Sequence, residues 1–378
     1  MVYLDNAATT PPCKAAIDKI NEMLTKNFAN ALSLHKAGFY AEEEVNKTRK
    51  LLASAIGAGD DEIIFTSGGT ESNNIAILGA AYANKKRGNR VITTDSEHPS
   101  VLNCFKNLEK QGYDVVYLPY KDGSLDIEKL RNSINSDTIL ISTLFVNNET
   151  GVINPVNIIK KIVNEKKSNA IIHVDAVQAF CKIPFSVSVL GADLLSISAH
   201  KFHGVKGAGA LYIKKGTLLS PINFGGGQER GLRNGTLNSP AIAAMGAAIN
   251  EFYNNINENY KYVSELNKYL RSEIKANVRD SVINSPDNAS PYVLNLSLPG
   301  LMAETILHFL EDDKIYVSTT SACSSRKRGI SYVLSAMGLE ERVIKGAIRV
   351  SLSPFNTKND IDQLVKGLIK CRETLKSN

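Results

Sequence analysis

Three side chains that could do chemistry follow apolar, strand-like segments. His98 stands in "TDSEHPS", Asp175 comes directly after "AIIHV", and Lys201 stands in "SAHKFHG". A single histidine is usually a surface or satisfied core residue, but a carboxylate or a lysine at the end of a buried strand costs free energy unless it is paired. An imidazole, a carboxylate and an amine can transfer protons or bond to a carbonyl group. These residues are therefore the first candidates for a catalytic site.

A second group of polar residues could bind an anion or donate hydrogen bonds. Gly69 and Thr70 lie in "TSGGTESNN", a turn that opens a helix, where backbone N–H groups and the positive helix end suit a phosphate. The same turn is also what an ordinary helix cap looks like. Asn148 in "VNNETG" and Gln178 in "HVDAVQ" could donate to a ligand, although asparagine in such a segment commonly serves turn geometry.

One cysteine, Cys323, lies among small hydroxyl residues in "VSTTSACSSRKRGIS", just before Arg326, Lys327 and Arg328. The local sequence allows a nucleophile, a metal ligand or a small apolar residue. The chain has five widely spaced cysteines and no CxxC pair, which argues against a disulfide framework and against a metal or iron–sulfur site built by this chain alone. We expect free, reduced thiols and no bound metal.

The apolar segments alternate with helical patterns and predict an α/β fold with a mainly parallel seven-stranded sheet. Several segments are apolar on both faces, as buried parallel strands are. The final two are joined by a loop too short for a crossover helix, so one of them should be antiparallel. The expected strands are 62–66, 90–94, 114–118, 138–146, 170–174, 194–198 and 209–213.

The pattern changes beyond about residue 255. A long polar amphipathic helix, "NENYKYVSELNKYLRSEIKANV", is followed by strand candidates at 292–298, 315–319 and 347–352. We predict a large domain over residues 15–255. Residues 1–14 and 256–378 should form a smaller α+β domain that carries the Cys323 loop.

Composition is ordinary for a globular protein, with 378 residues, 43% hydrophobic and 22% charged. No apolar run approaches the roughly 20 residues that span a bilayer, and "MVYLDNAATTPPCK" does not have the pattern of a signal peptide. We expect a cytoplasmic protein that does not contact the membrane. The net charge of +6 permits an acidic partner or RNA but requires neither.

Ligands of parallel α/β sheets bind beyond the carboxyl ends of the strands, which would bring the candidates above to one edge. Pyridoxal 5′-phosphate (PLP) needs a lysine for its Schiff base, an acid against its pyridine nitrogen and a pocket for its phosphate. The candidate set meets each of these needs, so the sequence predicts a PLP site.

The chain resembles cysteine desulfurases of the NifS/IscS type, within the class V aminotransferase superfamily of PLP fold type I. The similarity runs nearly end to end and rests on motifs in the family's order: "YLDNAATT", "FTSGGTESNN", "SEHPSV", "VNNETG", "HVDAVQ", "SAHKFHG", "GGGQERGLRNGT", "SACSS" and "IRVSLS". The resemblance implies a homodimer with two active sites at the subunit interface.

The resemblance also implies roles for single residues. Lys201 would form the Schiff base, Asp175 would pair with the pyridine nitrogen, and His98 would stack on the ring and pass protons. The phosphate would be held by Gly69, Thr70, Ser198 and His200, and Thr236 would reach the phosphate of the neighbouring subunit. Gln178 and Asn148 would contact the ring hydroxyl or the substrate carboxylate. Arg349 would be the clamp of that carboxylate.

Three positions depart from the family pattern. Thr320 stands where the family has Gly before Ser-Ala-Cys, the usual Pro is missing from His203-Gly204-Val205-Lys206, and Ala31 replaces a Pro in "NALSLH". None of these changes removes a group that makes or breaks bonds. Thr320 does restrict the backbone more than Gly would.

The implied activity is conversion of L-cysteine to L-alanine with a persulfide on Cys323. That sulfur would then pass to an iron–sulfur scaffold protein or a tRNA-thiolating enzyme. Alternatives are a selenocysteine lyase, a plain aminotransferase, which has no use for Cys323, and a non-catalytic sulfur-carrier scaffold. The bases after Cys323 would either steer an acidic partner or RNA, or be solvated charges.

Overall fold

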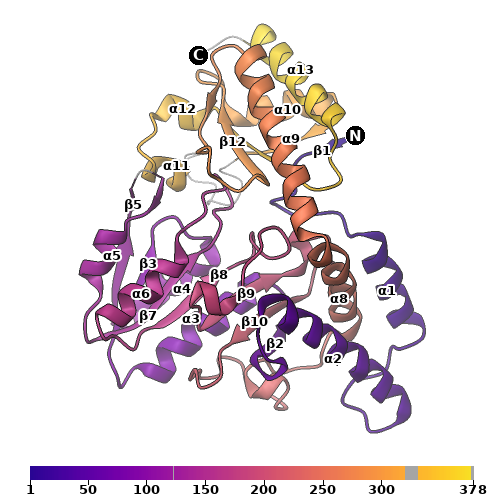
Figure 1. The fold of residues 1–378 in the computed structure, drawn as a ribbon, viewed down its shortest axis with the longest axis vertical. Coiled ribbons are helices and arrows are strands. Elements are labelled where there is room, and N and C mark those ends of the chain that lie inside the picture. Colours follow the sequence, from indigo (N-terminus) through magenta and orange to yellow (C-terminus); the bar gives the residue numbers. More distant parts are fainter. Residues whose placement is uncertain (122, 320–330, 376–378) are drawn as a thin grey trace.

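A seven-stranded sheet forms the centre of the larger part of the molecule (Figure 1). The computed structural model describes residues 1–121, 123–319 and 331–375. The strand order is β2-β10-β9-β8-β7-β3-β4. The strands are β2 (Ile63–Thr66), β3 (Arg90–Thr94), β4 (Asp114–Leu118), β7 (Thr138–Leu144), β8 (Ile171–Asp175), β9 (Leu194–Ser198) and β10 (Gly209–Ile213).

Strand direction brings six carboxyl ends to one edge of this sheet. The neighbours β9, β8, β7, β3 and β4 are parallel, whereas β10 is antiparallel to both β9 and β2. Because β10 opposes both neighbours, β2 runs in the same direction as β9. The predicted mainly parallel seven-stranded sheet, with one antiparallel strand in its final pair, is confirmed.

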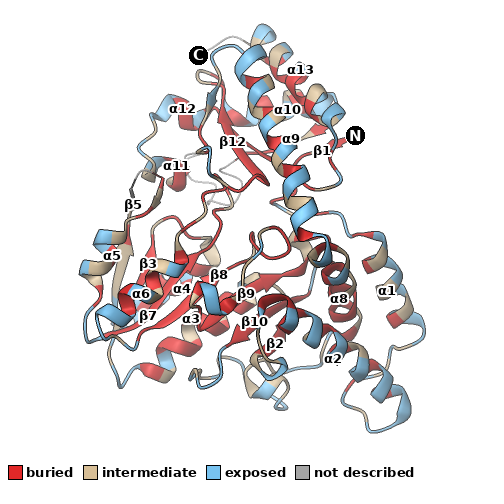
Figure 2. Cartoon of the chain, in the orientation of Figure 1, coloured by how far each residue is buried: buried red, intermediate tan, exposed pale blue. Residues whose placement is uncertain are grey.

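Helices cover this sheet, whose strands are buried over most of their length (Figure 2). The helix α1 packs on α8, and α2 also packs on α8. The helices of this part are α1 (Lys14–Thr25), α2 (Lys36–Ile56), α3 (Gly69–Asn84), α4 (Pro99–Lys110), α5 (Ile127–Ser133), α6 (Val156–Glu165), α7 (Val187–Leu190) and α8 (Ser239–Asn254). A small hairpin, β5 (Tyr120–Lys121) with β6 (Ser124–Leu125), lies beside them.

Local sequence explains where several helices begin and end. The side chain of His98 accepts from the backbone N–H of Ser100, and Pro99 occupies the first turn of α4, where its missing N–H costs nothing. Asn238 caps α8 in the same way through the N–H of Ala241. The helix α2 stops at Gly57, whose φ of 70° suits glycine.

The smaller part contains a four-stranded antiparallel sheet with the order β11-β12-β15-β14. Its strands are β11 (Val282–Ile283), β12 (Val293–Ser297), β14 (Ser318–Thr319) and β15 (Ala347–Ser351). Its helices are α9 (Ile256–Asn277), α10 (Ala303–Asp312), α11 (Tyr332–Ala336), α12 (Glu341–Lys345) and α13 (Lys358–Thr374).

The expected strand at 315–319 is in fact two short strands. β13 (Ile315–Tyr316) pairs in parallel with β1 (Val2–Tyr3), whereas β14 pairs with β15. The segment therefore changes partner at Val317, which a pattern of apolar residues cannot reveal. The N-terminal strand is thus built into the smaller part, beside α13 (Figure 1).

The two parts have separate apolar cores. One core contains residues from Cys13 to Phe252, and another contains Val2 and Leu4 with residues from Val263 to Cys371. We propose on this basis that residues 15–255 form one domain and that 1–14 with 256–378 form the other. Among the described residues, no helix is both long and apolar enough to span a membrane, and no cluster of three potential metal ligands occurs.

Candidate active site

A cavity of about 250 Å³ lies at the edge of the large sheet where the six carboxyl ends meet. Ten of the residues predicted from the sequence line it: Gly69, Thr70, His98, Asn148, Asp175, Gln178, Ser198, His200, Lys201 and Arg349. Main-chain segments far apart in the sequence thus converge on one site, together with Ala7 and Ala8 from the N-terminal segment.

One predicted residue that the structure describes is not in the cavity. Thr236 lies in the Gly-rich loop before α8 and is exposed, so it does not contribute to the cavity of its own chain. Cys323 lies outside the described residues, as do Thr320, Arg326, Lys327 and Arg328.

Asp175 is the last residue of β8, and its carboxylate is buried and held at both oxygens. Asn73 on α3 donates to Oδ2 over 2.8 Å, and the backbone N–H of Val177 donates to Oδ1 over 3.0 Å. These bonds stabilise the ionised carboxylate and fix its orientation. An oriented anionic group on the cavity wall suits a protonated ring nitrogen.

His98 is joined to Asp175 through two residues that the sequence did not single out. Its Nδ1 accepts from the Ser100 backbone N–H over 3.1 Å and lies 2.8 Å from the Ser100 hydroxyl. That hydroxyl also accepts from the amide of Asn73 over 2.8 Å. Ser100 and Asn73 thereby tie the imidazole to the carboxylate, but nothing in "ESNN" or "HPS" marks them before the strands are assembled.

Burial lowers the pKa of His98 below its ordinary value of 6.5, and the charge of Lys201 acts in the same direction while Asp175 opposes it. The imidazole is therefore neutral near pH 7. Since Nδ1 is an acceptor, Nε2 carries the proton. A neutral imidazole of this kind can take up and return a proton at the cavity wall.

Lys201 lies in a short 3₁₀ turn, Ala199–Lys201, directly after β9. Its Nζ donates to the carbonyl oxygens of Ala7 over 2.8 Å and Ala8 over 2.7 Å. The N-terminal segment thus holds the amine at the cavity wall. The motif "YLDNAATT" therefore contributes to the site, although it lies far from the lysine in sequence.

The first turn of α3 forms the other side of the cavity, close to Ser198 and His200. A Cβ on Gly69 would lie 2.7 Å from Cγ2 of Val177, so only glycine fits where this turn approaches the segment that follows β8. Burial, together with Lys201, Lys206 and Lys182, lowers the pKa of His200 to about 4, so this ring is neutral. N–H groups, a hydroxyl and a neutral imidazole suit a phosphate.

Arg349 comes from β15 of the smaller sheet and is buried. It donates to the carbonyl oxygen of Asn148 over 3.0 Å and to Asp5 over 2.8 Å. Its Nε has no hydrogen-bond partner among the described residues. A buried guanidinium in the cavity wall suits a ligand carboxylate.

The neighbouring Asn147 does not face the cavity but shapes the turn. Its side-chain oxygen accepts from the backbone N–H groups of Glu149 and Thr150 over 2.9 and 3.0 Å. The turn role that the sequence suggested for asparagine in "VNNETG" therefore applies to Asn147, whereas Asn148 lines the cavity.

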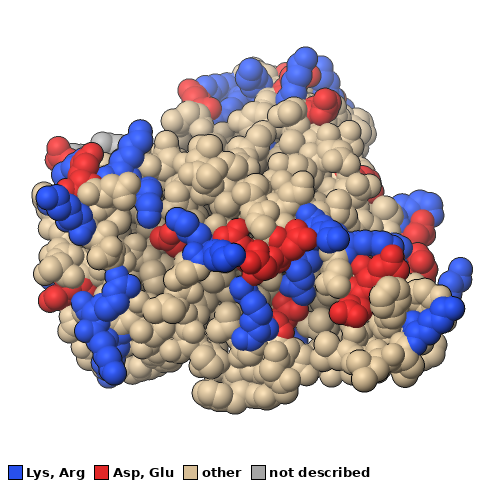
Figure 3. Space-filling view, turned by 60° about the horizontal axis from the view of Figure 1, so that its bottom comes forward, with Lys and Arg blue, Asp and Glu red and all other residues tan. Residues whose placement is uncertain are grey.

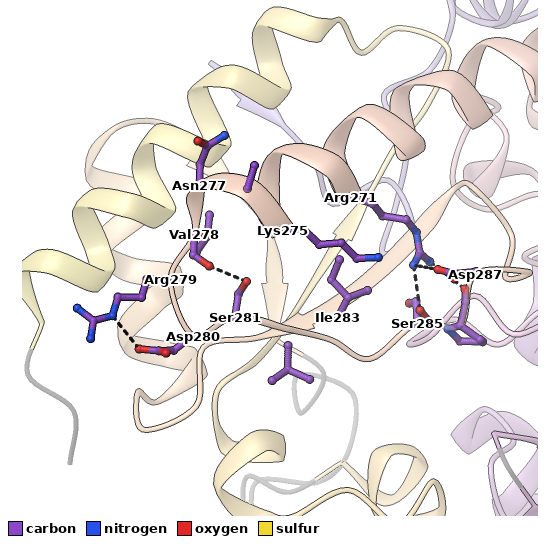
Figure 4. A pocket seen from close by; sticks show the side chains of 13 residues that line it. Arg271, Lys275, Asn277, Val278, Arg279, Asp280, Ser281, Ile283, Ser285 and Asp287 are labelled. Carbon is purple, nitrogen blue, oxygen red and sulfur yellow. Dashed lines mark hydrogen bonds and ion pairs between the residues drawn. The ribbon is translucent and has the colours of Figure 1, made fainter.

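A larger hollow of about 840 Å³ lies beside β11 and the end of α9, away from this site (Figure 4). Its arginines pair with neighbouring carboxylates, Arg271 with Asp287 over 3.1 Å and Arg279 with Asp280 over 3.4 Å. Among its described lining residues there is no histidine or cysteine. The hollow therefore provides no set of groups comparable to the first cavity.

The first cavity fits PLP by the chemistry of its groups. It presents an amine for the Schiff base, an oriented carboxylate for the pyridine nitrogen, a neutral imidazole to stack on the ring and a glycine-containing helix start for the phosphate. Lys201, Asp175, His98, Thr70, Ser198 and His200 would hold it.

The Aminotransferase class-V family matches residues 2–364. The chain belongs to the class-V aminotransferases. Enzymes of this family depend on PLP, in agreement with the cavity. Among the family, the chain groups with cysteine desulfurases. It is 41% identical to "Cysteine desulfurase IscS" of Dictyoglomus turgidum, over 100% of this chain and 95% of that one. It is 40% identical to the Methanosarcina thermophila protein of the same name, over 97% and 90%.

Solved structures of this class-V group have the same fold. A "NifS-like protein" superposes with a TM-score of 0.93 at 37% identity and covers 99% of this chain and 100% of its own. "SspA in complex with cysteine" has a TM-score of 0.84 at 32% identity, over 94% and 100%.

Glu97, directly before His98, is a buried carboxyl behind the site. Its Oε1 accepts from the Thr94 hydroxyl over 2.7 Å and from the Leu144 N–H over 3.0 Å. Burial nevertheless raises the pKa of Glu97 from 4.5 to about 8, to which the charge of Asp175 also contributes.

The folded protein should therefore lose stability as pH rises toward 8, because the folded carboxyl binds its proton more tightly than an unfolded one. We expect Glu97→Gln, which keeps the Oε1 acceptor, to reduce the decrease in free energy of unfolding between pH 6.5 and 8.5 by about 2 kcal/mol. Denaturant unfolding of both proteins across this range measures the effect. Curves that run parallel would contradict it.

Proposed function

We propose that this cysteine desulfurase binds L-cysteine in the cavity of Lys201, Asp175, His98 and Arg349, releases L-alanine and leaves the sulfur on Cys323 as a persulfide. The observation that carries the proposal is the convergence of these four side chains on one cavity. The solved complex of a related chain with cysteine supports the substrate.

The balance of the reaction needs no further oxidant or reductant. L-cysteine and the Cys323 thiol become L-alanine and the Cys323 persulfide, so the carbon–sulfur bond breaks while a sulfur–sulfur bond forms. PLP, when bound, accepts the electron pair released at the substrate Cα. Arg349 holds the substrate carboxylate, Lys201 moves the Cα proton, and His98 returns a proton to the product side.

The clamp role of Arg349 predicts a specific defect. Arg349→Lys should raise KM for L-cysteine about tenfold or more, because an ammonium cannot reproduce the planar pair of donors. Steady-state kinetics measure the change, with Arg342→Lys as the control because Arg342 is exposed. An unchanged KM in a folded Arg349→Lys protein would show that another group binds the carboxylate.

We also propose a homodimer in which Thr236 completes the site of the second subunit. Thr236 is exposed on the Gly-rich loop. Large apolar side chains are also exposed on that loop, on the segment between α1 and α2, and on α2: Phe224, Phe28, Leu34 and Phe39. Apolar residues of this size favour burial against another chain.

The acceptor of the sulfur is proposed to be an iron–sulfur scaffold protein or a tRNA-thiolating enzyme in the cytoplasm. On the face shown in Figure 3, basic and acidic side chains lie next to one another, so no single-sign surface is visible there. Recognition of an acidic partner or RNA by charge would therefore depend on another face. The names of the relatives favour cysteine over selenocysteine as the substrate.

A further inference from the structure

Lys182 is a buried lysine that the proposed reaction does not use. It lies seven residues after the end of β8, and only 6% of the residue is exposed. Among the described residues, no carboxylate forms an ion pair with it, and its ammonium lies 5.8 Å from the centroid of the Tyr292 ring. Burying an ammonium without a carboxylate costs several kcal/mol, so its presence calls for a specific role.

The ammonium makes one hydrogen bond to a side chain, and that side chain lines the cavity. Nζ of Lys182 donates to Gln178 Oε1 over 3.0 Å. An ammonium has only donors, so this bond fixes which end of the Gln178 amide faces Lys182. The amide nitrogen must then point the other way.

The other end of the amide meets the lysine of the active site at a shared carbonyl. Gln178 Nε2 donates to the Ala7 oxygen over 2.9 Å, and Lys201 Nζ donates to the same oxygen over 2.8 Å. Ala7 and Gln178 both line the cavity. The four groups thus form a continuous path from the buried ammonium of Lys182 to the amine of Lys201.

Without Lys182, only the Ala7 carbonyl would hold the amide of Gln178 in this orientation. In the flipped orientation the amide oxygen would face that carbonyl, and the cavity would receive an acceptor in place of a donor. Burial, with the charges of Lys201 and Arg349, lowers the pKa of Lys182 to about 7. A neutral amine could also accept from the amide nitrogen, so the ammonium form of Lys182 is the one that fixes the orientation.

We propose that Lys182 is a positioning residue, which holds the Gln178 amide with its donor end toward the cofactor cavity and toward the carbonyl that binds Lys201. The inference rests on the proposed PLP site and adds a residue that does not touch the cavity. Lys182 does not line that cavity. Its charge also acts on Lys201 and His200, and a double-mutant cycle with Gln178 separates that effect from the one that passes through the amide.

The test is binding of PLP to the apo-protein, followed by absorbance, in the parent, four variants and a control. Lys182→Met removes the donor but keeps the length of the side chain, and Lys182→Gln offers both a donor and an acceptor, so it no longer fixes which end of the Gln178 amide it meets. Gln178→Ala and the double variant Lys182→Met/Gln178→Ala complete a double-mutant cycle. Lys161→Met is the control, because Lys161 is exposed on α6.

We expect Lys182→Met to raise the dissociation constant of PLP about tenfold, Lys182→Gln to raise it by less because one of its two pairings with Gln178 keeps the observed orientation, and the double variant to bind no worse than the weaker single variant. Thermal unfolding of apo Lys182→Met should be unchanged or occur at higher temperature, because removing a buried unpaired charge is not destabilising. A purely structural lysine would instead lower the unfolding temperature.

Two outcomes would overturn the inference: unchanged PLP affinity in Lys182→Met, or losses that add fully in the double variant. Should Lys182→Met fail to fold, Lys182→Gln decides the same question, because a PLP affinity equal to that of the parent would overturn the inference. A parent protein that does not bind PLP would refute the proposed function itself, so the two failures are distinguishable.

Discussion

Cys323→Ala is expected to bind PLP normally and to form no persulfide. No other described cysteine can take over, since Cys13, Cys104, Cys181 and Cys371 are all buried. A thiolate is the only side chain here that can attack sulfur and carry it as a persulfide, so sulfide release in the presence of dithiothreitol should fall to background.

The measurement pairs sulfide release with mass spectrometry of the protein after incubation with L-cysteine. Cys371→Ala, in α13 of the smaller part, is the control because it removes a thiol far along the chain from the cavity. Undiminished sulfide release from Cys323→Ala would refute the carrier role, whereas retained PLP absorbance shows that the cavity itself is intact.

Lys201→Ala is expected to cause the second large effect. The variant should lose the covalent attachment of PLP, and turnover should fall by at least about 10²–10⁴-fold, because both the nucleophilic amine and the group that moves the Cα proton disappear. Ala7 and Ala8 would lose their shared donor but can be hydrated in the widened cavity.

Borohydride reduction followed by mass spectrometry tests the attachment directly. The parent protein should gain the mass of the reduced cofactor on the peptide that contains Lys201, and Lys201→Ala should not. Lys215→Ala is a suitable control since Lys215 is largely exposed. Label on another lysine in the parent protein would contradict the assignment.

Most strands could be predicted because they are short, apolar on both faces and separated by helices or turns. β3, β4, β9 and β10 occupy the predicted ranges, and the antiparallel pairing of β9 with β10 followed from the length of the loop between them. The switch of partner between β13 and β14 could not be predicted, because it depends on β1, which comes from the other end of the chain.

The residues of the site likewise divide into those that the sequence could predict and those that it could not. Residues directly after strands could be named from sequence, since the carboxyl ends of parallel strands meet at one edge. Three further residues, which the sequence did not single out, hold the site residues through side-chain hydrogen bonds. Asn73 holds Asp175, Ser100 holds His98, and Lys182 holds Gln178. Hydrogen bonds between side chains on different elements leave no periodic pattern in a sequence.

By itself the sequence determined the class of fold, the lysine, carboxylate and histidine of the site and the family to which the chain belongs, because these depend on local pattern and on motifs in a set order. The tertiary structure decided which groups share hydrogen bonds: that the N-terminal carbonyls hold Lys201, that Arg349 crosses from the smaller sheet to Asn148, and that a buried lysine orients Gln178. Contacts of this kind join residues as many as 344 positions apart, as in the bond between Arg349 and Asp5, and only the folded chain brings them within hydrogen-bonding distance.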